Sequence, residues 1–160
     1  MYILGFCFLI VLLLVGCALN KSSKEKDLQR LSRIEIYSSD GDFINMIEDE
    51  NILYQFNNLN YFDTSLETDS EQEKLKNTVE SLVVLYTIIS YKTPAAVYND
   101  GTLEKKMEII VYENSNIMKE QISSDNIKGV STSEEYLTFY SILSEKDKDF
   151  ILSLCEPNNL

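Results

Sequence analysis

An uncharged apolar run, Tyr2 to Leu19, opens the chain and limits what can fold. It is too apolar for an ordinary surface element and about as long as the shortest membrane helices. An N-terminal run of this kind is a targeting or anchoring segment and takes no part in a soluble core. The folded unit must therefore come from the residues that follow. In a chain of 160 residues these suffice for a single small domain, which we place at 32–157.

The apolar run reaches a cysteine in the sequence Leu14-Val15-Gly16-Cys17, which resembles the lipobox of bacterial lipoproteins. The resemblance implies that a lipoprotein signal peptidase cuts between Gly16 and Cys17. It also implies that the Cys17 thiol becomes a thioether to diacylglycerol, which would hold the chain on the membrane. Residues 1–16 are then the signal peptide. Residues 17–31 form the lipidated cysteine and a polar, flexible tether. The resemblance therefore predicts a location on the outer face of the cell membrane.

An uncut transmembrane helix is the alternative interpretation of the same run. A signal peptide normally begins with positive charge, yet only Met1 precedes the apolar residues, and we expect a start further upstream to supply that charge. If the run stayed uncut, the basic residues Lys21, Lys24 and Lys26 would place the domain in the cytoplasm, because positively charged flanks stay inside.

Charge and composition exclude several classes of function. From Ile34 onward the chain has nine basic and 24 acidic side chains, a net charge of −15. Such a body repels nucleic-acid phosphates, so nucleic-acid binding is not expected. Histidine, the side chain most often used for proton transfer at neutral pH, is absent from the sequence. We expect no cofactor and no metal ion.

The pattern of apolar residues predicts an α+β fold: an antiparallel sheet of about five or six strands, with two or three helices packed on one face. Asp40-Gly41 indicates a hairpin turn. Asp49 is placed to cap a helix, and Ser144 with Asp147 three residues later resembles a capping box. The predicted strands are 61–66, a central strand at 81–92, and 107–112, 116–123 and 136–143. The segment 67–76 is either an exposed loop or the start of a helix.

The element order adds a second, broader resemblance. The chain resembles small lipoproteins of low-GC Gram-positive bacteria in its layout, which is a lipobox, a short tether and a small α+β domain rich in Lys, Asn, Ile and Tyr. That resemblance implies an extracytoplasmic location and assigns no active site.

The acidic residues and the tyrosines are the candidates for chemistry. The carboxylates form four clusters: Asp40 and Asp42; Glu48, Asp49 and Glu50; Glu67, Asp69, Glu71 and Glu73; Glu134 and Glu135. Two of them across a cleft could hydrolyse glycosides, and the first cluster offers oxygen ligands for Ca²⁺ but not the spacing of a calcium-binding loop. We interpret the clusters as solvated surface and most of the tyrosines as sheet packing. Cys155 is interpreted as a buried apolar residue of the last helix.

The function predicted from these observations is that of a lipid-anchored binding or interaction module outside the cell, not an enzyme. An immunity or exclusion lipoprotein and an envelope hydrolase with paired carboxylates are the alternatives. The expected partners are the membrane, through the lipid on Cys17, and a protein of the envelope. No catalytic, cofactor-binding or metal-binding residue is assigned, and the oligomeric state stays open.

Overall fold

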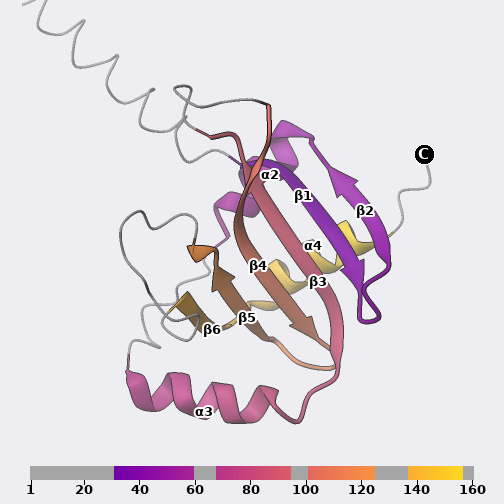
Figure 1. The fold of residues 1–160 in the computed structure, drawn as a ribbon. Helices are drawn as coiled ribbons and strands as arrows, with labels where there is room; N and C mark the ends of the chain where they lie inside the picture. Colours follow the sequence, from indigo (N-terminus) through magenta and orange to yellow (C-terminus); the bar gives the residue numbers. More distant parts are fainter. Residues whose placement is uncertain (1–30, 60–67, 95–100, 125–136, 157–160) are drawn as a thin grey trace, which may run out of the picture.

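A computed structural model describes residues 31–59, 68–94, 101–124 and 137–156 of the chain. Its centre is a six-stranded sheet in which every neighbouring pair is antiparallel, in the order β2-β1-β3-β4-β5-β6 (Figure 1). The strands are β1 (Leu31–Ser38), β2 (Phe43–Ile47), β3 (Val84–Lys92), β4 (Glu104–Tyr112), β5 (Ile117–Ile122) and β6 (Thr138–Ile142). Three helices accompany them in the described part of the chain: α2 (Glu50–Asn57), α3 (Asp69–Val79) and α4 (Glu145–Cys155). The predicted α+β class is confirmed.

The hairpin between β1 and β2 forms where the sequence predicted it. Gly41 adopts a positive φ of 85°, which an L side chain rarely tolerates. The Ser38 amide donates to the Asp42 carbonyl over 2.8 Å, and the Ser38 hydroxyl accepts from the Asp42 amide over 3.1 Å. This turn fixes the register in which Ile34 lies opposite Ile47.

Two helices cover one face of the sheet, which we call the covered face. In Figure 1 α2 and α4 both lie behind the strands. Each helix starts at the predicted cap, because the Asp49 carboxylate accepts from the Asn51 and Ile52 amides and the Ser144 hydroxyl accepts from the Asp147 amide. Their apolar sides meet the inward side chains of the strands in one cluster. Its fully enclosed members are Ile34, Ile36, Phe56, Ile88, Ile109, Met118 and Ile151. Burying each such side chain contributes roughly 1.5–3 kcal/mol, and the core therefore lies between the sheet and these two helices.

The third helix, α3, lies apart from the other two, near the β6 side of the sheet (Figure 1). The sequence left open whether the segment 67–76 is a loop or the start of a helix. From Asp69 onward it belongs to α3. The central strand starts at Val84 rather than Ser81, because the Ser81 and Leu82 amides donate to Thr78 and Val79 carbonyls and so continue the end of α3.

Some predictions fall outside the described residues. These are the lipobox with Cys17 and the strand at 61–66. Among the described residues, no helix is long and apolar enough to cross a membrane.

Candidate functional site

The face of the sheet opposite α2 and α4 carries a regular array of polar, charged and aromatic side chains, and we call it the open face. Side chains on a strand alternate between faces, so the register assigns each residue to one of them. Three rows run across the strands of the open face. They are Arg33, Tyr91 and Lys105; Glu35, Ile89, Glu108, Gln121 and Thr138; and Tyr37, Thr87, Ile110, Lys119 and Tyr140. All thirteen side chains of these rows are partly exposed.

Glu35 is the centre of a hydrogen-bond network on this face. Its Oε2 accepts from the Tyr37 hydroxyl over 2.8 Å and from the Tyr91 hydroxyl over 3.0 Å. Its Oε1 lies 3.5 Å from a guanidinium nitrogen of Arg33, whose Nε donates to Glu48 over 2.9 Å. The Glu35 side chain is only 17% exposed, so these donors replace most of the water that a carboxylate requires.

The two tyrosines of the network are held as hydrogen-bond donors. Burial, followed by the hydrogen bond to Glu35, raises the pKa of Tyr91 to about 12. The hydrogen bond to Glu35 is the largest cause that raises the pKa of Tyr37. Both phenols are therefore protonated at any physiological pH, and the network keeps one fixed pattern of donors and acceptors.

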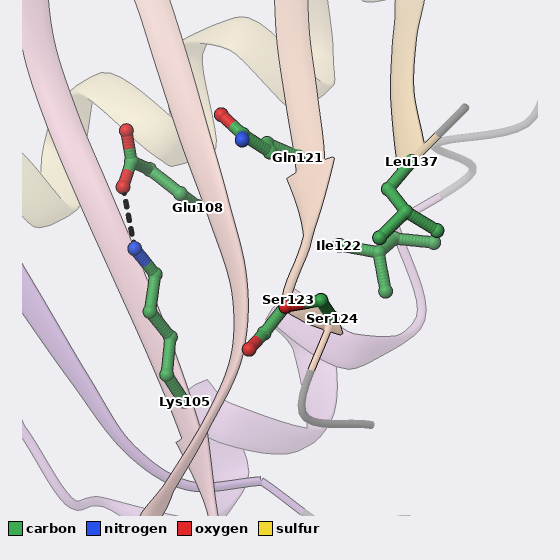
Figure 2. A pocket seen from close by; sticks show the side chains of 7 residues that line it. All are labelled: Lys105, Glu108, Gln121, Ile122, Ser123, Ser124 and Leu137. Carbon is green, nitrogen blue, oxygen red and sulfur yellow. Dashed lines mark hydrogen bonds and ion pairs between the residues drawn. The ribbon is translucent and has the colours of Figure 1, made fainter. Parts of the chain in front are cut away.

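A polar hollow of about 300 Å³ lies beside this network, over β4 and β5 (Figure 2). Lys105 donates to Glu108 over 2.6 Å along one wall, and Gln121 projects from the next strand. Ser123, Ser124 and Leu137 form the other side. In Figure 2 the Lys105, Glu108 and Gln121 side chains stand in front of the strands, while α4 passes behind them. The hollow thus belongs to the open face.

A second hollow, of about 640 Å³, lies between α3 and the β5 and β6 strands. Its lining combines charged, amide and aromatic groups: Asp69, Gln72, Glu73, Lys76, Lys119, Thr138, Phe139 and Tyr140. Since Lys119 and Tyr140 also belong to the open face, this groove continues the same surface toward the edge of the sheet.

The covered face encloses an acidic side chain, Glu120, which sequence analysis did not single out. It is 1% exposed, its Oε1 accepts from the Ser141 hydroxyl over 2.6 Å, and its Oε2 has no hydrogen-bond partner. Burial raises the pKa of Glu120 to about 7, and the bond from Ser141 opposes part of that rise. A side chain so enclosed does not meet a substrate, so its consequence is for stability.

The described members of the predicted carboxylate clusters do not converge on one site. Asp40 and Asp42 are exposed in the hairpin turn, and Asp49 caps α2. Asp69 and Glu71 lie in the first turn of α3, where carboxylates interact favourably with the helix dipole. Glu67, Glu134 and Glu135 lie outside the described residues. Within the part of the chain that the structure describes, no three acidic or cysteine side chains are grouped to hold a metal ion.

The interpretation of Cys155 is confirmed, because this residue is buried at the end of α4 and burial raises its pKa to about 12. The tyrosines divide more than predicted. Tyr112 is buried in the sheet, whereas Tyr54 on α2 is 70% exposed. Tyr37 and Tyr91 supply hydroxyls to Glu35.

Comparisons of this chain with protein-family models, with curated proteins and with solved structures give no match. The site must therefore be interpreted from its own geometry.

Proposed function

We propose that this chain is a lipid-anchored binding module that meets a macromolecular partner of the cell envelope through the open face. The anchor rests on the resemblance of Leu14 to Cys17 to a lipobox. The binding role rests on the open face itself, which carries an ordered network in place of loosely solvated charges.

The observation that carries the binding role is the network of Arg33, Glu35, Tyr37 and Tyr91. Association costs free energy when flexible side chains become ordered, and side chains already fixed by hydrogen bonds reduce that cost. Arginine and tyrosine are also the residue types that contribute most at protein interfaces. The open face therefore has the composition and the rigidity that suit recognition.

The competing hydrolase is less well supported by the same face. Glu35 and Glu108 share one row with Ile89 of β3 between them, which places their Cα atoms roughly 10 Å apart at the usual strand spacing. The two carboxyl groups of a glycosidase lie roughly 5–9.5 Å apart, and one of the pair must act as an acid. Each of these two carboxylates instead faces a cation, Arg33 or Lys105.

The anchor is tested by the intact mass of the full chain extracted from bacterial membranes, beside a Cys17→Ser variant. We expect the unaltered chain to lose residues 1–16 and to gain the mass of diacylglycerol, and the variant to show neither change. An unprocessed mass in both chains would overturn the lipid anchor and favour the uncut helix.

The binding surface is tested by photo-crosslinking in cells. A photoreactive amino acid replaces Thr87 or Gln121 on the open face, and Ser153, exposed on α4, serves as the control position. We expect one adduct of constant mass from both open-face positions and none from Ser153. Adducts of the same yield at all three positions would contradict a binding role of the open face.

A further inference from the structure

The outer edge of the sheet at β6 is closed by a side chain instead of a strand. Among the described residues, β6 is the last strand of the sheet. The Gln72 side-chain amide from α3 donates to the Tyr140 carbonyl over 2.8 Å and accepts from the Tyr140 amide over 2.9 Å. One amide group thus makes both hydrogen bonds that a residue of a neighbouring antiparallel strand would make to Tyr140.

The helix that carries Gln72 is only shallowly buried. Of its eleven residues, Asp69–Val79, Val79 alone is buried. The groove of about 640 Å³ remains between this helix and the sheet, with Phe139 and Tyr140 in its lining. Little apolar area would be lost if α3 moved away from β6, so the free energy that holds it there is small.

The opposite edge strand of the sheet, β2, differs because it is hydrogen-bonded to a well-buried helix. There the Asn45 side chain accepts from the Met46 amide over 2.9 Å and donates to the Leu154 carbonyl of α4 over 3.2 Å. α4 buries Ile151, Leu154 and Cys155 in the core. At both edge strands an amide side chain thus accepts from a strand amide, but only Asn45 of β2 is also linked to a well-buried helix.

We propose that the outer edge of β6 is a docking site for an extended peptide segment of a partner, which pairs with Tyr140 in place of the Gln72 amide. The inference rests on the binding role proposed above and names the class of partner. Because side chains and peptide groups alternate along a strand, Ile142 presents its own peptide groups to the same edge, and its side chain is 49% exposed. An incoming strand therefore finds a register of at least these two residues.

The lining of the groove indicates which side chains the bound peptide carries. Two carboxylates, Asp69 and Glu73, and two lysines, Lys76 and Lys119, line it, so the groove has no net charge. Aromatic side chains of β6 offer apolar contact to alternate residues of the peptide. Backbone pairing and apolar contact, rather than charge, then select the partner.

The experiment uses a displayed library of random twelve-residue peptides, selected on the full chain in detergent micelles. A selected peptide is titrated against the unaltered chain and against Gln72→Ala, Gln72→Glu and Gln121→Ala. We expect Gln72→Ala to lower the Kd of the peptide roughly tenfold, because the peptide no longer has to displace the two hydrogen bonds of Gln72. A factor of this size corresponds to the net free energy of one or two hydrogen bonds. Gln72→Glu keeps the size of the side chain and can accept from Tyr140 but not donate, so it should tighten binding less.

Hydrogen exchange of the Tyr140 and Ile142 amides provides the second measurement, with thermal unfolding to confirm that each variant is folded. We expect the bound peptide to slow exchange of the Ile142 amide, and Ser153→Ala on α4, a control position away from both surfaces, to change neither binding nor exchange. Unchanged or weaker binding by Gln72→Ala, or a library that yields no binder, would overturn the edge site. A peptide whose affinity depends on Gln121 and not on Gln72 would also overturn it, while leaving the open face as a binding surface intact.

Discussion

Glu35 on the open face and Glu120 on the covered face both have little exposure to water, and the two are accommodated in opposite ways. Glu35 on the open face accepts hydrogen bonds from two tyrosines and approaches Arg33. Glu120 on the covered face has a single hydroxyl partner, Ser141, and burial raises its pKa to about 7. A carboxyl group with little water around it needs either a set of donors or its own proton. The open face supplies donors, whereas on the covered face Glu120 keeps its proton up to a pH of about 7.

The largest expected effect is a loss of stability with rising pH, caused by Glu120. Its pKa is about 7 in the folded chain and near its ordinary value of 4.5 in the unfolded chain. Between these values the folded state binds more protons, so the free energy of unfolding falls as pH rises from about 4.5 to 7 and then levels off. The expected loss is about 3 kcal/mol, from 1.36 kcal/mol per pKa unit.

Denaturant unfolding at a series of pH values between 4 and 8 measures this loss. A Glu120→Gln variant cannot ionise and is the matched control, whose stability should lack this part of the pH dependence. The same slope in the variant and in the unaltered chain would show that Glu120 is not the group responsible.

The next largest effect concerns Glu35. Glu35→Ala removes the acceptor shared by Tyr37 and Tyr91 and leaves two partly buried hydroxyls without their partner. We expect it to lower the free energy of unfolding by about 1–2 kcal/mol, within the range for a donor that loses its acceptor. Glu35→Gln keeps a side-chain acceptor and should lose less. Equal losses in both variants, measured by denaturant unfolding, would mean that packing and not hydrogen bonding holds this side chain.

Local signals predicted much of the fold, whereas contacts between distant residues could not be predicted. The Asp40-Gly41 turn and the Asp49 and Ser144 caps depend on neighbours within four residues, and all three appear where expected. The hydrogen bond from Tyr91 to Glu35 joins residues 56 positions apart. Which residue lies opposite Tyr91 depends on the register of β1 against β3, and a single sequence does not specify that register.

Glu120 shows the same limit more sharply. In the sequence it stands between Lys119 and Gln121, a composition typical of a solvated strand. Alternation does place it on the face opposite both neighbours. That this face is the buried one follows only from the position of β5 between β4 and β6, with Met118 in the core beside it.

A smaller effect is expected in the titration of Tyr91. Because burial is the first cause and the bond to Glu35 the second, Glu35→Gln should lower the pKa of Tyr91 from about 12 without returning it to the ordinary value of 10. Ultraviolet absorbance of the phenolate during an alkaline titration follows this change, and Tyr91→Phe identifies which transition belongs to Tyr91. An unshifted transition in Glu35→Gln would contradict the network on the open face.

The smallest effect is expected at the hollow of Figure 2, from the ion pair of Lys105 and Glu108. The lysine and glutamate side chains are 39% and 25% exposed, and ion pairs in contact with water contribute between nothing and about 1 kcal/mol. Lys105→Met keeps much of the aliphatic length and should change the free energy of unfolding by less than about 0.5 kcal/mol, and by less still at high salt, which screens such pairs. This is the effect expected if the pair serves recognition rather than folding. A loss of stability near that of Glu35→Ala would show instead that this ion pair stabilises the fold. The Glu35 network would then not differ from the rest of the open face in its contribution to stability.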